Sequence, residues 1–248
     1  MKEQLYTIPL NDAVNADDEC PFCFIERNVE QDLLDYVLGS GSSYMEADMR
    51  EITDREGFCR DHFKKMFTYG NTLGNGWILK THYMKIRSEL NKEIKAFHPG
   101  KSSLFKKAET NSLAAWAYEK KESCYICGQF KKTYSRYMDT FFHLWDNDPE
   151  FVEKIKKSKG FCIPHFADLI TCADNKLSGN QKEEFYKIVN NLMEENMDRL
   201  QEDVSWLVEK FDYQNQDADW KNSKDAVQRG MQKLKGGYPA DAPYRSSK

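Results

Sequence analysis

The clearest hydrophobic pattern in the chain lies near its C-terminal end, where apolar residues recur every three or four positions. The residues of this stripe are Phe185, Ile188, Val189, Leu192, Met193, Leu200, Val204, Leu207, Val208 and Phe211. Such spacing is typical of an amphipathic helix with one face against a core. It predicts one long helix over residues 182–211, about 45 Å in length at a rise of ~1.5 Å per residue.

A second helix with the same spacing is predicted earlier in the chain. Its apolar positions are Trp77, Leu79, Tyr83, Ile86, Leu90 and Ile94. We expect this helix to end near Phe97, because Pro99 cannot continue it. Residues 99–112 are predicted to link two units.

The chain after the long helix is polar. We expect residues 212–248 to form a C-terminal extension, with a short helix over residues 223–235 that Gly236 ends. Trp220 stands alone in this polar segment, which predicts that the extension docks on the helical body.

Six of the seven cysteines belong to two motifs that each occur twice. The motifs are Cys-x-x-Cys, at Cys20 and Cys23 and again at Cys124 and Cys127, and Gly-Phe-Cys-x-x-His-Phe, with Cys59 and His62 and again Cys162 and His165. The copies are offset by 104 residues for the first motif (20 to 124) and by 103 for the second (59 to 162). The chain is therefore expected to contain an internal duplication.

Each copy predicts the same order of elements. A Cys-x-x-Cys turn precedes a helix (roughly residues 23–38 and 128–145), a shorter helix leads into Gly-Phe-Cys, and a further helix follows. Because no convincing strand is found, we predict an all-α fold of two pseudo-repeated helical units, residues 1–98 and 113–211. Each unit is expected to be pinned by its own Cys3His metal site.

Three thiolates and one imidazole form a ligand set that suits a tetrahedral zinc ion. Cys-x-x-His on the first turn of a helix places both side chains on one face, and the helix N-terminus stabilises the thiolate form. The predicted ligands are Cys20, Cys23, Cys59 and His62 for one ion, and Cys124, Cys127, Cys162 and His165 for the other. Four protein ligands leave no open position for water, so we expect two structural zinc ions per chain.

The same cysteines leave other interpretations open. Cysteine with one histidine can hold an iron–sulfur cluster. Cys20-Pro21-Phe22-Cys23 resembles the active-site motif of glutaredoxins, although that chemistry resides on a βαβ scaffold and the second copy lacks the proline. A redox or metal-handling protein is therefore the first alternative. Buried core cysteines without metal remain a further possibility.

Charge and composition exclude some classes of protein. The chain has 36 basic and 40 acidic residues, a formal charge of −4, which is too balanced to indicate nucleic-acid binding by itself. Residues 80–107, however, contain eight Lys or Arg, so a nucleic-acid-associated protein is the second alternative.

No apolar run long enough to span a membrane and no leader segment are found, which predicts a cytoplasmic location without membrane contact. His82, His98 and His143 are not at ligand spacing.

Taken together, the duplicated motifs, the long helix and the stretch from Lys210-Phe211-Asp212-Tyr213 to Trp220-Lys221-Asn222-Ser223-Lys224-Asp225 resemble a bacterial family of unknown function. The resemblance covers residues 5–236, and some members are labelled as substrate-binding proteins of ABC transporters. It implies the eight Cys and His positions named above and no established activity.

No nucleophile elbow, phosphate-binding loop or zinc-protease motif is found in the sequence. The sequence therefore predicts a non-enzymatic, zinc-binding helical protein, a binding or adaptor module with an unidentified protein partner or a second copy of itself.

Overall fold

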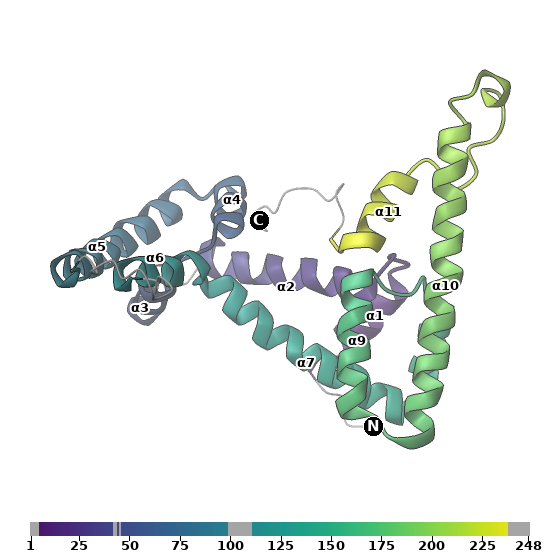
Figure 1. Cartoon of the computed structure of the whole chain (residues 1–248), viewed down its shortest axis with the longest axis horizontal. Coiled ribbons are helices and arrows are strands. Elements are labelled where there is room, and N and C mark those ends of the chain that lie inside the picture. Colours follow the sequence, from purple (N-terminus) through teal and green to yellow (C-terminus); the bar gives the residue numbers. More distant parts are fainter. Residues whose placement is uncertain (1–4, 42–43, 45, 99–110, 238–248) are drawn as a thin grey trace, which may run out of the picture. The chain divides into compact units, whose positions relative to one another are not determined.

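The computed structural model describes residues 5–41, 44, 46–98 and 111–237. These residues form helices and loops with no strand among them, which confirms the all-α class (Figure 1). They divide into two compact units, a first that runs up to Val29 and resumes at Lys132, and a second from Glu30 to Lys131. The division falls inside α2 (Pro21–Leu38) and α7 (Tyr125–Asn147), so each of these helices contributes to both units.

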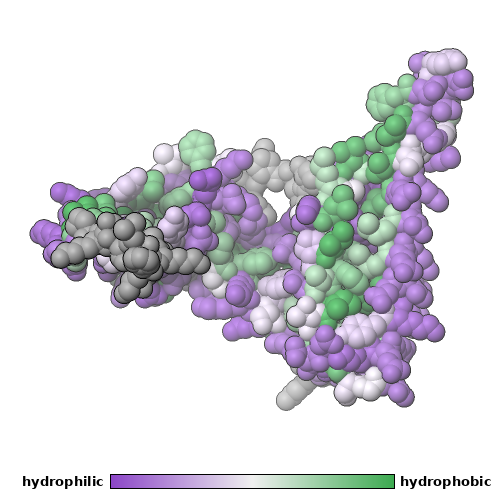
Figure 2. Space-filling model, viewed as in Figure 1, coloured by the Kyte–Doolittle hydropathy of each residue, from purple (hydrophilic) through white to green (hydrophobic). Residues whose placement is uncertain are grey.

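The first unit is built around the long helix expected from the apolar stripe. The long helix is α10 (Gly179–Glu209). Besides parts of α2 and α7, the unit also contains α1 (Thr7–Asn15), α8 (Pro149–Lys157), α9 (Ile163–Lys176) and α11 (Ala226–Lys235). The long helix α10 packs against α8, α9 and α11. Helices α9 and α11 are labelled beside it in Figure 1. The side of α10 that faces these helices is apolar and includes the buried Phe185, Val189 and Leu200, whereas its other side is hydrophilic (Figure 2).

The second unit contains shorter helices and the predicted counterpart of the long one. Its helices are α3 (Ala47–Glu56), α4 (Arg60–Tyr69), α5 (Thr72–Ala96) and α6 (Ser112–Glu122). The counterpart α5 packs mainly on α3, with α4 and α6 as further neighbours. Its start is fixed by Asn71, whose side-chain oxygen accepts a hydrogen bond of 2.8 Å from the backbone N–H of Gly74.

The two copies of each cysteine motif have matching local structures. Gly57 and Gly160 both take left-handed backbone angles, with φ of 62° and 74°. The phenylalanines that follow them, Phe58 and Phe161, are both buried. A side chain at Gly57 would also collide with His82, because a Cβ there would lie 2.8 Å from the imidazole. Glycine is therefore required where the chain turns into the second motif.

The C-terminal extension folds back on α10. A short 3-10 helix, η2 (Tyr213–Asn215), is followed by α11, which Gly236 ends at a φ of 77°. The half-buried ring of Trp220 lies 5.1 Å from the ammonium nitrogen of Lys210 at the end of α10. Lys210 in turn donates hydrogen bonds to three carbonyl oxygens of the loop after it. These contacts agree with the expected helix and with the docking of Trp220.

Other expectations have mixed outcomes. The helices predicted at residues 23–38, 128–145, 77–97 and 182–211 are present as α2, α7, α5 and α10, within a few residues of the expected limits except at the start of α5. The repeat units at residues 1–98 and 113–211 stay a prediction from sequence similarity. Most of the predicted linker, residues 99–110, and residues 238–248 of the extension lie outside the described residues. In the described part of the chain, no helix has both the length and the apolar character that a membrane span requires.

Candidate metal centres

The structure gathers the eight predicted ligands into two groups of four. Group A consists of Cys20, Cys23, Cys162 and His165, and group B consists of Cys59, His62, Cys124 and Cys127. In each group, one donor atom from every residue lies within 4.8 Å of the others. Group A belongs to the first compact unit and group B to the second.

The predicted pairing of the motifs is wrong. The sequence suggested that Cys20 and Cys23 share an ion with Cys59 and His62, but each group combines the Cys-x-x-Cys of one copy with the Cys-x-x-His of the other. The reason lies in α2, which begins just after Cys20 and continues to Leu38. His62 contacts Glu30, which is ten residues and about 15 Å along this helix from Cys20. The first copy of Cys-x-x-His therefore lies beside a later part of α2.

Every motif lies at the N-terminus of a helix. Cys20 directly precedes α2 and Cys124 directly precedes α7, whereas Cys59 and Cys162 are the N-cap residues of α4 and α9. Group A is thus formed where α2 and α9 begin, and group B where α4 and α7 begin. Since the positive end of a helix dipole stabilises an anion, two helices at each group favour the thiolate form that a metal ion needs.

The distances between donor atoms suit a single tetrahedral ion. In group A, the Sγ atoms of Cys23 and Cys162 are 3.7 Å apart, and His165 Nδ1 lies 3.1–3.6 Å from the three sulfurs. In group B, the Sγ atoms of Cys59 and Cys127 are 3.8 Å apart, and His62 Nδ1 lies 3.2–3.4 Å from the sulfurs. Ordinary zinc bond lengths place sulfurs about 3.8 Å apart and sulfur and nitrogen about 3.5 Å apart in a tetrahedron.

Both histidines are oriented by a carboxylate on α2. The Nε2 atom of His165 lies 3.1 Å from Oε1 of Glu26, and that of His62 lies 3.0 Å from Oε1 of Glu30. A carboxylate that accepts from Nε2–H leaves Nδ1 free to bind a metal and increases its basicity. The sequence reasoning missed both residues. Glu26 follows Cys23 by three positions, so helical spacing signals it, whereas Glu30 serves the other group and gives no such signal.

The close contact of thiols and imidazole in group B raises the pKa values of His62 and Cys127 and lowers that of Cys124. Burial opposes the imidazolium form of His62, but contacts with Cys124 and Glu30 outweigh it and raise its pKa to about 10. Burial also disfavours the thiolate of Cys124, yet the hydrogen bond with His62 lowers the pKa of this thiol to about 6. Burial and the neighbouring Cys124 raise the pKa of Cys127 to about 12. His62 and Cys124 thus form an imidazolium–thiolate pair at neutral pH, and a bound cation is needed to deprotonate Cys127.

The remaining histidines and the seventh cysteine lie outside both groups. His82 is half-buried, with Nδ1 2.9 Å from the carbonyl oxygen of Asp54, and His98 and His143 are exposed. Cys172 is a half-buried free thiol. None of these residues is among the eight donors of groups A and B.

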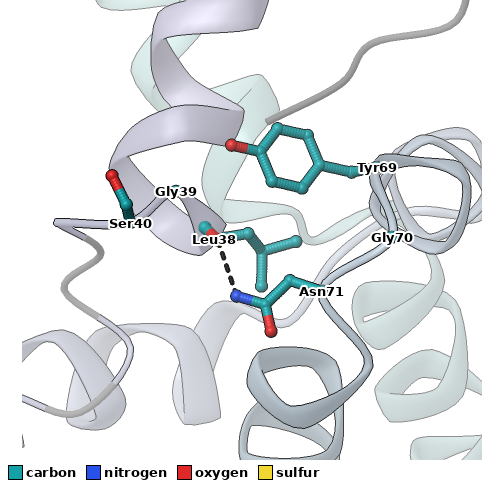
Figure 3. Close-up of a pocket in the computed structure, with 6 residues that line it drawn as sticks. All are labelled: Leu38, Gly39, Ser40, Tyr69, Gly70 and Asn71. Carbon is teal, nitrogen blue, oxygen red and sulfur yellow. Dashed lines mark hydrogen bonds between the residues drawn. The ribbon is translucent and has the colours of Figure 1, made fainter. Parts of the chain in front are cut away.

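A small cavity in the second unit has a volume of about 290 Å³ and lies at the end of α2 (Figure 3). Its lining residues are Leu38, Gly39, Ser40, Tyr69, Gly70 and Asn71. Asn71 donates from Nδ2 to the carbonyl oxygen of Leu38 at 2.7 Å, and Tyr69 donates to Asp35. Because its polar side chains already serve to join α2 to the turn before α5, we assign this cavity no function.

Comparison with known families matches residues 1–241 to a family described as "Family of unknown function (DUF6062)". The chain belongs to this family. Comparison with curated proteins and with solved structures finds no match. The two Cys3His groups are thus features of a DUF6062 protein for which the comparisons supply no activity.

Proposed function

We propose that this DUF6062 protein is a non-enzymatic binding or adaptor module in which two structural zinc ions, one in each group, hold the helices together. The observation that supports it is the presence of four donors at single-ion spacing, twice in one chain. A full set of four protein ligands leaves no coordination position for a substrate or water, which argues against hydrolytic chemistry. Bound zinc supplies free energy of folding to such sites.

The chain's own residues make each group a junction between distant segments. In group A, the thiols at the start of α2 meet those at the start of α9, and in group B the start of α4 meets the start of α7. Glu26 and Glu30 hold the imidazole rings so that Nδ1 points at the thiols. We therefore assign the ions a structural role.

Elemental analysis with a visible spectrum tests this proposal. The protein is purified without oxygen and without a histidine tag, and thiols are titrated before and after chelation. We expect two zinc ions per chain, no colour, six newly reactive thiols on chelation and loss of helical structure. Iron with visible absorption, or a metal-free protein that keeps its fold, would overturn the proposal.

A redox or iron–sulfur protein is the first alternative. A cluster places several irons and sulfides between its ligands, whereas all donor atoms of each group lie within 4.8 Å of one another. This compact spacing favours a single ion in each group. The colour of the purified protein separates the two possibilities.

A nucleic-acid-associated protein is the second alternative. Five of the eight basic residues predicted for this role are exposed on α5, namely Lys80, Lys85, Arg87, Lys92 and Lys95, whereas Lys101, Lys106 and Lys107 lie outside the described residues. Binding to nucleic acid through these side chains would weaken steeply with added salt, because phosphate contacts release counterions. Titration of labelled single- and double-stranded oligonucleotides at two salt concentrations tests this alternative.

The adaptor role requires a partner surface, and α5 supports it. Tyr83, Met84 and Ile94 are exposed on the same helix as the basic residues, so a partner that is both apolar and acidic, or a second copy of the chain, fits this helix. Light scattering during size-exclusion chromatography tests for the second copy.

The cytoplasmic location stays a proposal, supported by seven free cysteines, which a reducing compartment preserves.

A further inference from the structure

The two groups differ in their exposure to solvent. All four ligands of group A are buried, and its three cysteines are each 0% exposed. In group B, Cys59 is half-buried and Cys127 is exposed, while His62 and Cys124 are buried. A molecule in solution can therefore reach a sulfur ligand of group B without any movement of the chain.

The end of the C-terminal helix covers the thiols of group A, while the rings of Phe22 and Tyr134 pack on His165. A Cβ atom built at Gly236, just after α11, would lie 3.7 Å from Sγ of Cys162 and 3.9 Å from Sγ of Cys23. The backbone at Gly236 thus lies directly against two of the thiols. Lys233, which is 1% exposed, fixes α11 there by donating to the carbonyl oxygens of Glu19 and Lys159 at 2.7 Å and 2.6 Å.

From this difference, and on the basis of the proposed zinc content, we propose that group B is an exchangeable metal site and group A a permanent one. Cys127 is the point of exchange. An incoming thiolate or chelator forms a bond to the ion as the bond to Cys127 breaks, and the released Cys127 thiolate takes a proton from water. Each further donor of the incoming ligand replaces one more protein ligand, so that the ion leaves without oxidation or reduction.

Through this exchange the protein would transfer a zinc ion, in addition to using zinc to stabilise its own fold. The group B ion can pass to and from small thiols or metal-binding molecules, whereas the group A ion cannot be reached until α11 moves. The ligand class is therefore a soft, monoanionic or chelating donor small enough to approach Cys127. The two groups belong to different compact units, so we expect group A to keep its ion while group B exchanges.

Zinc release from the full chain tests the proposal. The protein is loaded with two equivalents of zinc, and a chromogenic chelator, 4-(2-pyridylazo)resorcinol, is added in excess. We expect one ion to leave at least tenfold faster than the other. In parallel, iodoacetamide labels the thiols, and peptide mass spectrometry follows each cysteine. Cys127 and Cys59 should be labelled before Cys20, Cys23 and Cys162, with the half-buried non-ligand Cys172 as the zinc-independent reference.

A matched pair of variants assigns the two phases. Cys127→Ser should remove the fast phase and Cys23→Ser, at the corresponding position of the other copy, the slow one. Two ions that leave at the same rate, or group A cysteines labelled as fast as Cys127, would overturn the exchange proposal alone. A protein that takes up no zinc would overturn the proposed function as well. The labelling order in the unaltered chain decides the question even if a variant fails to fold.

Discussion

The Nε2 atom of His165 lies 3.1 Å from Oε1 of Glu26, while Nδ1 of the same ring faces the thiols of group A. Glu26 follows Cys23 by three residues on α2, so a single helix supplies ligands and also the carboxylate that orients a ligand from α9. The same helix carries Glu30, which orients His62 in group B. One helix thus fixes the ring orientation of the histidine in each group.

Loss of the Glu26 carboxylate should weaken metal binding at group A. Removing the partner of a ligating histidine typically lowers metal affinity by about 10–100-fold. We expect Glu26→Ala to do so at one of the two sites, with Glu26→Gln in between because its amide oxygen still accepts from Nε2. Competition titration with a chelator of known affinity measures the change. Glu30→Ala should affect the other site instead, and an equal effect of both variants on one site would refute the assignment.

The exchanged pairing of motifs can be tested by counting ions. Cys20→Ser should cost one zinc ion, and adding Cys162→Ser should cost no further ion because both residues serve group A. Adding Cys59→Ser to Cys20→Ser should remove both ions. Pairing within each copy demands the opposite pattern, so the zinc content of the two double variants distinguishes the two arrangements.

Zinc binding at group B should release protons. Between the pKa of Cys124, about 6, and that of His62, about 10, both His62 and Cys127 are protonated in the metal-free site. Zinc must displace these protons, so raising the pH strengthens binding and lowering it weakens binding. With at least two protons released, affinity should change about 100-fold or more per pH unit. Calorimetry in buffers of different ionisation enthalpy counts the protons, and a count below two contradicts the prediction.

The buried carboxylate of Glu19 should be important for stability. It is 2% exposed and contacts Arg199 at 2.5 Å, Lys233 at 3.2 Å and Arg229 at 3.4 Å. Arg199 and Arg229 also contact Asp203, but among the described residues Lys233 has its ion pair with Glu19 alone. Glu19→Gln therefore leaves the buried Lys233 without its counter-charge, and breaking a buried ion pair in this way costs about 3–5 kcal/mol. Urea unfolding of the zinc-loaded protein measures the loss. Glu153→Gln, in an exposed pair with Lys156, serves as the control and should leave stability unchanged.

Two glycines should respond to alanine in opposite directions. Gly57→Ala places a Cβ at a left-handed φ and 2.8 Å from the imidazole of His82, so we expect a loss of about 1–3 kcal/mol. Gly76 lies inside α5 with no atom within 4 Å of an added Cβ. Gly76→Ala should therefore stabilise the protein by about 0.5–1 kcal/mol. Thermal unfolding of both variants checks the signs, and stabilisation by Gly57→Ala would show that its turn tolerates a side chain.

The ligands and most helices could be predicted because their signals are local. Cys-x-x-Cys and Cys-x-x-His give their spacing directly, and α10 shows its buried face as a periodic stripe of apolar residues. By contrast, α6 has no buried residue among those described, so its sequence contains no stripe to detect. Helix α1 is only nine residues long and gives a weak periodic signal.

The grouping of the ligands could not be predicted, because it depends on the distance that a long helix places between successive motifs. Nearness in sequence favoured Cys20 with Cys59, yet α2 carries the chain past group A before α4 begins. Glu30 could not be assigned for the same reason, since its partner His62 lies on α4, and α3 comes between α2 and α4 in the chain. The shielding of group A by Gly236 also depends on a contact between segments far apart in the sequence.

Because each group combines motifs from both copies, the chain segment between the ligands of group B is nested inside the segment between the ligands of group A. The contact between Cys59 and Cys127 closes a loop of 68 residues that lies entirely inside the 145-residue loop closed by Cys20 and His165. Once the inner loop is closed, the effective loop between the outer ligands is shorter. Closing the outer loop then costs less conformational entropy. During synthesis group B is also completed first, because Cys127 emerges before Cys162 and His165. The chain therefore has a built-in order of assembly, from group B outward to group A, with α11 covering the last junction to form.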